Sequence, residues 1–173
     1  MTTVVILEKL QSFLKENVCS HIKLQKPSDD DVDKYELVNP TVHTGWIPPK
    51  GILPAELESA IPCLIVGMDD GNDDGLEGSI GIRISAVVYS PGLHKENGGA
   101  IEFIPDFQGY NDLLNLLDRT IAEIAKNQII NGVKVEYPIK WGMYQDNQPY
   151  PYWYGWVSFT VKKQSYPKAL IEL

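Results

Sequence analysis

The residues that come closest to a chemical motif lie between Asp70 and Gly81. Asp70, Asn72 and Asp74 alternate along the chain, and Gly75 follows them. This spacing matches the opening of a calcium-binding EF loop, in which side-chain oxygens alternate and a glycine permits the sharp turn. The twelfth position of such a loop is a bidentate glutamate, but here it is Gly81, inside a predicted strand. We therefore interpret the segment as an acidic hairpin, with calcium binding at Asp70, Asn72 and Asp74 as the alternative.

The other titratable and nucleophilic side chains form no catalytic or metal-binding motif in the sequence. His21, His43 and His94 are scattered, and neither HExxH nor CxxC occurs. The phosphate-binding patterns GxxxxGK[ST] and GxGxxG and the GxSxG elbow of hydrolases are absent as well. We expect no enzymatic activity, no cofactor and no metal, with an unrecognised hydrolase as the enzymatic alternative. Cys19 and Cys63 are expected to be buried, reduced thiols.

The segment Tyr150–Trp156 is rich in aromatic residues. Tyr and Trp are enriched at interfaces because they bury much area with few torsions and keep a polar tip, and adjacent aromatic planes also suit sugar stacking. Three interpretations stay open: packing on the protein's own sheet and on the loop Lys26–Pro54, a subunit interface, or a carbohydrate site. The candidate interface residues are Tyr150, Tyr152, Trp153, Tyr154 and Trp156.

These aromatic residues belong to a predicted last strand, Tyr152–Lys163, whose two faces differ. One face carries Trp153, Val157, Phe159 and Val161, and the other carries Tyr152, Tyr154, Trp156, Ser158 and Thr160. Because both faces bear large apolar groups, we expect both to be covered, and a partner chain is one way to cover the second.

The hydrophobic periodicity switches from 2 to 3.6 and back, which predicts an α+β fold. The predicted helices run from Thr2 or Thr3 to Asn17 and over Asp112–Asn127. The predicted strands are His21–Leu24, Ile61–Met68, Gly78–Tyr89, Val133–Trp141 and Tyr152–Lys163. We expect a mixed, mainly antiparallel sheet of about four or five strands, with the long helix across one face and the N-terminal helix beside it.

The remaining segments are expected to be connections within a single domain, residues 1–173. Residues 26–60 form a predicted long loop insertion, anchored by Trp46 and Ile47 and with one helical turn at Ala55–Ser59. Gly98–Gly109 is predicted to be a loose connection, and residues 164–173 a C-terminal extension.

The composition limits the classes of partner. Among the 173 residues 43% are hydrophobic, which is enough for a core, and the formal net charge is −8. An acidic chain without a run of basic residues is not expected to bind nucleic acid or an anionic membrane directly. The apolar run Val4–Leu7 is too short for a signal peptide or a membrane span, so we expect synthesis in the cytosol.

The order of the segments in Ile61–Lys163 resembles that of the tail terminator (tail completion) proteins of long-tailed phages and of the related minor tail proteins. The segments that carry the resemblance are IPCLIVGM, GSIGIRISAVVYS, GYNDLLNLLDRTIAEIAKN, VEYPIKW and PYWYGWVSFTVKK, preceded by the amphipathic helix VVILEKLQSFLKENV. The insert Lys26–Pro54, the acidic turn Asp69–Gly78 and the tail Gln164–Leu173 depart from the compact family pattern.

This resemblance implies a structural virion component without catalytic residues. Such a subunit would form a homo-oligomeric ring, expected to be a hexamer, that caps the tail tube and joins it to the head. Its partners would be copies of itself, the tail tube protein and a head-completion protein. Its location would be the host cytoplasm during assembly and then the tail of a phage or prophage virion. The alternative is a carbohydrate- or peptide-binding module that uses the aromatic strand Tyr150–Trp156.

Overall fold

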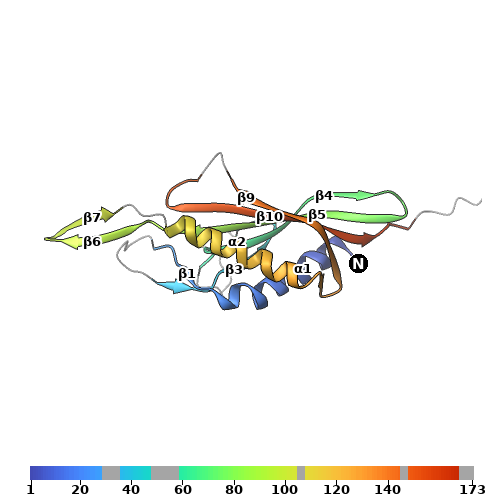
Figure 1. Ribbon diagram of the computed structural model, residues 1–173, viewed down its shortest axis with the longest axis horizontal. Helices are drawn as coiled ribbons and strands as arrows, with labels where there is room; N and C mark the ends of the chain where they lie inside the picture. The colour runs from blue at the N-terminus through green and yellow to red at the C-terminus, as the bar shows by residue number, and fades with distance from the viewer. Residues whose placement is uncertain (29–35, 48–58, 105–107, 145–147, 168–173) are drawn as a thin grey trace, which may run out of the picture.

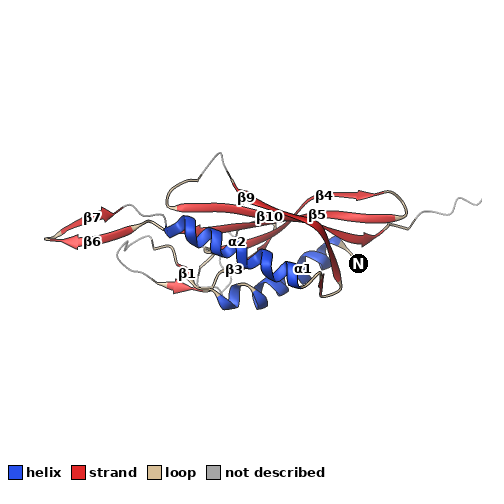
Figure 2. Cartoon of the chain, in the orientation of Figure 1, coloured by secondary structure: helices blue, strands red, loops and turns tan. Residues whose placement is uncertain are grey.

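The computed structural model describes residues 1–28, 36–47, 59–104, 108–144 and 148–167. In this part of the chain, two α-helices lie against a mixed six-stranded sheet with the strand order β3-β4-β5-β10-β9-β8. Both helices contribute to the same hydrophobic core, and they lie on the same side of the sheet (Figures 1 and 2). The predicted α+β class is confirmed, and the sheet has six strands rather than four or five.

The first helix, α1 (Thr3–Asn17), forms because a capping residue precedes an amphipathic segment. Thr2 Oγ1 accepts a hydrogen bond from the backbone N–H of Val5 at 3.4 Å. The apolar residues Ile6, Leu10, Phe13 and Leu14 are buried, as the periodicity predicts. A short 3-10 helix, η1 (Cys19–His21), follows, so the predicted strand His21–Leu24 is wrong at its start. Of its residues only Leu24 belongs to a strand, β1 (Leu24–Gln25).

The second helix, α2 (Gln108–Lys126), begins four residues before the predicted start at Asp112. Its buried stripe contains Leu113, Leu116, Leu117 and Ile124. Thr120 is also fully buried on this side, where its hydroxyl donates to the carbonyl oxygen of Leu116 at 2.8 Å. This bond within the helix lets a polar side chain face the sheet without an unpaired group.

The centre of the sheet is an antiparallel ladder of four long strands. These are β4 (Cys63–Asp73), β5 (Glu77–Tyr89), β10 (Tyr152–Gln164) and β9 (Val133–Met143). The residues of β5 that the alternation assigns to one face, Ile80, Ile82, Ile84, Ala86 and Val88, all belong to the core under the helices. The strands predicted over Gly78–Tyr89, Val133–Trp141 and Tyr152–Lys163 are thus confirmed within a few residues.

Short strands complete the edges of this sheet. On one side β3 (Thr41–Thr44) pairs with β4 in parallel, which makes the sheet mixed. On the other side β8 (Ile129–Ile130) pairs with the start of β9. The turn between β8 and β9 is Asn131–Gly132, and both residues have positive φ values, 50° and 83°. Asn and Gly tolerate this region better than other residues do, which explains the strong turn signal in the sequence.

Two regions differ from the expected loops. The segment Lys26–Pro54 contains β2 (Leu37–Val38), paired with β1, as well as β3, and Trp46 does not anchor it because 66% of that residue is exposed. The helical turn expected at Ala55–Ser59 lies outside the described residues except for Ser59. The connection expected to be loose holds β7 (Ala100–Ile104), which pairs with β6 (Leu93–Asn97) in a hairpin that projects from one end of the molecule (Figure 1).

Candidate functional site

The strand β10 divides the aromatic residues between the two faces of the sheet. Trp153, Val157 and Phe159 belong to the core or pack against it under the helices. Their neighbours Tyr152, Tyr154, Trp156 and Ser158 alternate with them and lie on the opposite face. We call this second face the open face; on β5 it carries Arg83 and Ser85, which lie in register with Ser158 and Trp156. The predicted two-faced character of this strand is confirmed.

Trp153 is separated from the other four candidate interface residues by this alternation. Its indole packs beneath the start of α2, where it meets Tyr110 edge-on at 6.3 Å between ring centroids. A Cβ atom at Gly109 would overlap the indole, so the helix approaches the ring closely only because residue 109 is glycine. The Nε1 atom is buried and has no hydrogen-bond partner among the described residues. These contacts place Trp153 on the helix side of the sheet, packed against the core.

Trp156 stands at the centre of the open face between an arginine and a glycine. The guanidinium carbon of Arg83 lies 5.3 Å from the ring centroid, within cation–π distance. On the neighbouring strand, a Cβ at Gly142 would lie 3.1 Å from Cζ2 of the indole. The ring packs closely against this strand because residue 142 is a glycine. Trp156 remains half-buried and therefore presents part of its surface outward.

Arg83 is held in place by a two-pronged ion pair with Asp69. Arg83 Nε donates to Asp69 Oδ1 at 2.9 Å and to Oδ2 at 2.8 Å, and Nη2 lies 2.7 Å from Oδ2. Hydrogen bonding to this carboxylate raises the pKa of Arg83, so the guanidinium stays charged. The side chains are 38% and 39% exposed, so the pair contributes little to stability but fixes the direction of the guanidinium over the indole.

A β-bulge places Asp69 in this position. Met68 pairs with Ile82 and Asp70 pairs with Gly81, so Asp69 is an extra residue of β4 without a partner of its own. Before the bulge, the even-numbered residues Leu64 and Val66 face the helices. After it, Asp70 and Asn72 pair with the open-face positions Gly81 and Ser79, so these two polar side chains point away from the core.

Tyr144 and Gln148 lie beside the open face at the end of β9 and before the start of β10. The hydroxyl of Tyr144 lies 2.9 Å from Ser85 Oγ, so this side chain reaches from the end of β9 across β10 to β5. Gln148 Oε1 accepts from the backbone N–H of Tyr154 at 2.7 Å, and Nε2 donates to the carbonyl oxygens of Tyr154 and Tyr144 at 2.9 and 2.7 Å. Partial burial raises the pKa of Tyr154.

Tyr152 and Tyr150 lie at the start of β10. Tyr152 packs against the buried Tyr89, with ring centroids 5.4 Å apart and the planes tilted by 57°. Tyr150 is largely exposed, and its hydroxyl donates to the carbonyl oxygen of Pro91 at 2.7 Å. Of the five candidates, Tyr152, Tyr154 and Trp156 thus line one continuous face, and Tyr150 lies near its border.

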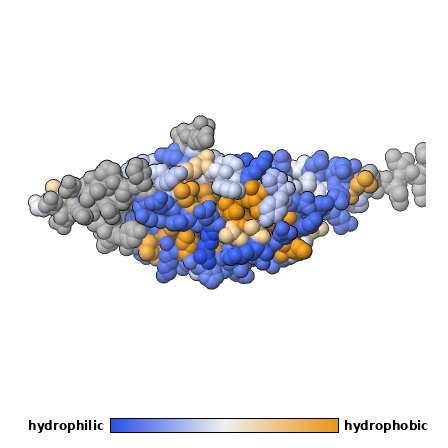
Figure 3. Space-filling model, viewed as in Figure 1, coloured by the Kyte–Doolittle hydropathy of each residue, from blue (hydrophilic) through white to orange (hydrophobic). Residues whose placement is uncertain are grey.

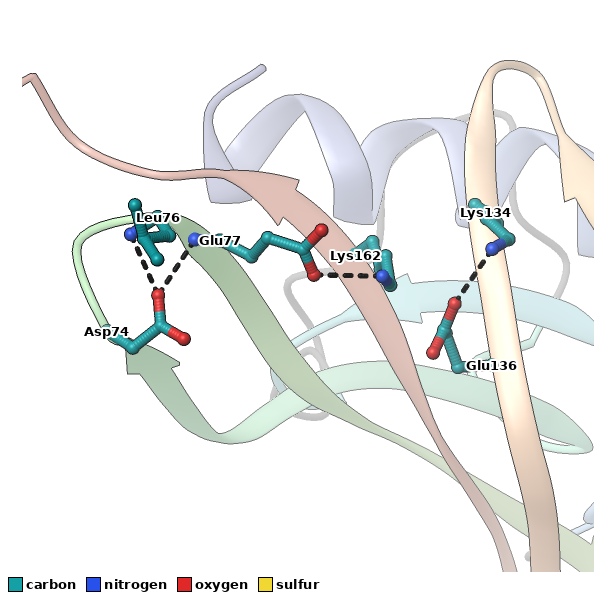
Figure 4. A network of polar contacts seen from close by, with 6 residues as sticks. All are labelled: Asp74, Leu76, Glu77, Lys134, Glu136 and Lys162. Carbon is teal, nitrogen blue, oxygen red and sulfur yellow. Dashed lines mark hydrogen bonds and ion pairs between the residues drawn. The ribbon is translucent and has the colours of Figure 1, made fainter.

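The far end of the open face carries paired charges from three strands (Figure 4). Lys162 Nζ on β10 lies 2.9 Å from Glu77 Oε2 on β5, and Lys134 Nζ lies 3.0 Å from Glu136 Oε1 on β9. Hydrogen bonding to Glu77 raises the pKa of Lys162, and the charge of Glu136 adds to the effect. The face therefore changes along the strands from aromatic to ionic.

The calcium candidate adopts the hairpin that the sequence favours. Asp74 Oδ1 accepts hydrogen bonds from the backbone N–H groups of Leu76 and Glu77, both at 2.8 Å, and so closes the β4–β5 turn (Figure 4). Asp70 and Asn72 instead lie along β4, in register with Gly81 and Ser79. Within the described ranges, no group of three or more His, Cys, Asp or Glu side chains has the arrangement of a metal site.

The two cysteines and the histidine of β3 are buried. Burial raises the pKa of Cys19 to about 12, and it raises the pKa of Cys63 as well, with a smaller effect from Cys19. Both are free thiols. The ring Nε2 of His43 lies 2.9 Å from Thr41 Oγ1 and 3.0 Å from the carbonyl oxygen of Ala60, which ties β3 to the segment before β4.

Sequence reasoning identified the aromatic residues of this face but not their polar partners. Arg83 and Ser85 alternate with the buried isoleucines of β5, so their side of the strand was readable from the sequence. Asp69 was hidden by the bulge, and Tyr144 because it follows the end of β9 and belongs to no alternating pattern. Together these residues offer a half-exposed aromatic surface with a fixed cation and several hydroxyls, which suits recognition of another surface.

The comparisons with known proteins add no family. No protein-family model matches the chain, and no curated protein matches it either. Neither helix in the described part of the chain combines the length and the apolar character that a membrane span requires.

Proposed function

We propose that this chain is a non-enzymatic structural subunit of a phage or prophage tail. In this proposal it acts as a tail terminator: copies form a ring, expected to be a hexamer, that caps the tail tube, stops its growth and joins it to the head. The direct partners are further copies of the chain, the tail tube protein and a head-completion protein. The subunit assembles in the host cytoplasm and remains in the virion tail.

The observation that carries this proposal is the open face with Trp156 at its centre. The helices cover one face of the sheet, whereas the opposite face presents a half-buried tryptophan beside a charge-paired arginine. Tryptophan, tyrosine and arginine dominate the binding energy of protein interfaces when they are surrounded by well-packed neighbours. The order of β4, β5, α2, β9 and β10 also follows the order of segments on which the resemblance to tail terminators rests.

Mutating Trp156 to alanine tests the proposal. We expect Trp156→Ala to weaken self-association and binding to tail tubes by roughly 2 kcal/mol or more, as for a central interface residue, while the melting temperature changes far less. Light scattering and negative-stain images measure association, and thermal melting measures folding. Trp46→Ala is the matched control, because Trp46 is exposed and follows the edge strand β3 rather than belonging to β10 or its neighbours.

Two results would contradict the proposal. One is an equal loss of association and folding in Trp156→Ala, which would make the residue part of the core. The other is a wild-type protein that stays monomeric at high concentration and forms no ring when mixed with tail tubes.

One observation favours a second function, a carbohydrate- or peptide-binding module. The Trp156 ring lies beside the guanidinium of Arg83, which pairs with Asp69, and Tyr144 bonds to Ser85 opposite Trp156. Such an arrangement can also stack a sugar ring and bind its hydroxyls. Binding on a glycan array together with quenching of tryptophan fluorescence, lost in Trp156→Ala and kept in Trp46→Ala, would support this alternative.

A further inference from the structure

The turn between β4 and β5 carries an exposed apolar surface at one end of the sheet. Leu76 in this turn is 86% exposed, and Tyr166, which follows β10, is 65% exposed. The carboxylate of Asp73 accepts hydrogen bonds from the backbone N–H groups of Gly75 and Tyr166, so the two segments lie side by side. We call residues 73–77 together with Tyr166 the tip. The tip extends beyond the helices in Figure 1, and Figure 3 shows hydrophobic atoms at this end among hydrophilic ones.

Side-chain hydrogen bonds fix the conformation of the tip. The carboxylate of Asp74 closes the turn around Leu76 (Figure 4). The carboxylate of Asp73 also accepts a hydrogen bond from Ser165 Oγ at 2.7 Å, beside the bond from Tyr166 at 2.8 Å. A surface that is already ordered loses little conformational entropy when it binds, so more of its burial contributes to affinity. The tip therefore presents its two apolar side chains in an arrangement suited to docking.

The tip is acidic. Three of the side chains between residues 73 and 77 are carboxylates, those of Asp73, Asp74 and Glu77, and none is basic. Lys162 pairs with Glu77, and Lys163 lies over the ring of Tyr166 at 3.6 Å from its centroid. These two lysines offset two of the three negative charges, so the tip keeps a net negative charge. A partner surface for the tip should therefore be apolar at its centre and positive beside it.

The open face around Trp156 has these properties. Lys140 lies in register with Ser158, two residues along β10 from the tryptophan, and it is exposed on this face. In the described part of the chain, Lys140 takes part in no ion pair. Arg83 and Asp69 neutralise each other beside the indole. This part of the face thus combines a half-buried aromatic ring with one uncompensated cation.

We propose that the tip of one copy docks on the open face of the next copy, with Leu76 and Tyr166 against Trp156 and the carboxylates of the tip toward Lys140. This inference rests on the proposed ring and names the occupant of its interface. The contact joins two different surfaces of the same chain. It is therefore head-to-tail, the kind of contact from which a ring closes.

The tip cannot occupy the open face of its own chain. Ser85 lies in register with Trp156, and Glu77 begins the same strand at the tip. Residues 77 to 85 of an extended strand span about 26 Å at roughly 3.3 Å per residue. The tip is fixed to the end of the sheet by its hydrogen bonds, so only the tip of another copy can reach the indole.

The charges also favour this pairing over symmetric contacts between copies. Two tips placed together would bring acidic groups against acidic groups. Two open faces placed together would bring Lys140 of one copy toward Lys140 of the other. The contact of a tip with an open face joins opposite charges, and such complementarity selects the partner surface.

Two substitutions on exposed residues test the contact from its two sides. We expect Leu76→Ala and Lys140→Glu each to weaken ring formation by roughly tenfold or more, because one removes an apolar contact and the other repels the acidic tip. The matched controls are Ile129→Ala, at a residue that is 69% exposed on β8, and Lys15→Glu, at an exposed position of α1. Assembly is measured by sedimentation and negative-stain microscopy between about 1 and 100 μM, and folding by thermal melting, which none of these variants should change much.

Disulfide trapping tests which surfaces meet. When Leu76→Cys protein is mixed with Ser158→Cys protein and oxidised, a covalent dimer should form, and the double variant L76C/S158C should form longer linked chains. A link within one copy is excluded, because the two Cα atoms of a disulfide lie within about 7 Å of each other. The native thiols Cys19 and Cys63 are buried and should not compete. The control mixture of K15C with S158C should give no such dimer on a non-reducing gel.

The outcomes separate this contact from the proposed ring. A wild type that forms rings, with assembly that survives both substitutions and no L76C–S158C link, would overturn the docking of the tip and leave the ring standing. Covalent dimers of S158C alone would mean that two open faces meet, which contradicts the docking as well. Loss of tail-tube binding without loss of self-association in L76A would assign the tip to another protein and overturn it too. A wild type that stays monomeric would overturn both proposals.

Discussion

The two faces of β10 show how one strand can serve both folding and recognition. On the helix side, Val157 and Phe159 are buried among leucines of α2 and isoleucines of β5. On the open face, Trp156 and Ser158 alternate with them but are only half-buried, and their neighbours include the charged Arg83. The aromatic segment therefore has two separable parts. Trp153 belongs to the part that packs under the helices, and Trp156 belongs to the part on the open face.

The sharpest way to test this separation is a matched pair of substitutions on adjacent residues. Phe159→Ala should lower the free energy of unfolding by about 3–5 kcal/mol, because it removes a buried ring and leaves a cavity. Ser158→Ala on the open face should change it by less than about 0.5 kcal/mol. Urea denaturation measures both, and similar losses would mean that the two faces do not differ in the way described.

Next in expected size is Gly109→Ala at the start of α2. The added Cβ would overlap the indole of Trp153 and come within 2.8 Å of Ser90 Cβ, so the helix must shift. We expect a loss of about 1–3 kcal/mol in unfolding free energy, although alanine favours helices elsewhere. Self-association of the folded fraction should not change. Stabilisation by this substitution would show that Trp153 is not packed tightly against α2.

A smaller effect is expected from Arg83→Gln on the open face. This variant removes the ion pair with Asp69 and the cation above Trp156. Because both side chains are more than a third exposed, the loss of unfolding free energy should be at most about 1 kcal/mol. Association should fall by more than that, since the guanidinium lies beside the proposed contact residue. Titration by light scattering at low and high salt measures it, and Lys15→Gln is the control.

The smallest effect concerns pH and a surface aspartate. Hydrogen bonds from Ser165 Oγ and from the backbone N–H groups of Tyr166 and Gly75 hold the pKa of Asp73 below its usual value. A carboxyl with a lowered pKa in the folded state contributes stability above its unfolded pKa of about 4, and this contribution is lost as pH falls through the folded value. Asp73→Asn should therefore slightly reduce the loss of unfolding free energy as pH falls below about 4, measured by urea denaturation at several pH values. The same loss in the variant and the wild type would count against these hydrogen bonds.

The sequence predicted the long, regular elements well because their side chains follow one period without interruption. The leucines of α2 and the isoleucines of β5 are such cases, and each occupies the face that its period indicates. The acidic end of β4 was missed because the aspartates suggested a turn, whereas pairing with Gly78–Ile82 keeps the chain extended to Asp73. The short strand β3 forms by pairing in parallel with β4, which lies about twenty residues later in the chain. No local pattern of side chains indicates that β3 is a strand.

The candidate site was predictable only in part for the same reason. The aromatic alternation of β10 gave Tyr152, Tyr154 and Trp156 a common face, and the structure keeps them there. Their polar neighbours come from three other segments. Arg83 reaches the tryptophan, Asp69 reaches Arg83 and Tyr144 reaches Ser85 only once the strands are in register. Local periodicity cannot reveal contacts that depend on register.

The extra residue in β4 has a consequence for how this protein tolerates change in length. Removing Asp69 would leave Met68 opposite Ile82 and Asp70 opposite Gly81, so every side chain between this point and the hairpin would keep its side of the sheet. The guanidinium on the neighbouring strand would lose its counter-ion, but no polar group would turn toward the hydrocarbon interior. A single-codon deletion at this point should therefore be about as damaging as replacing Asp69 by a neutral residue.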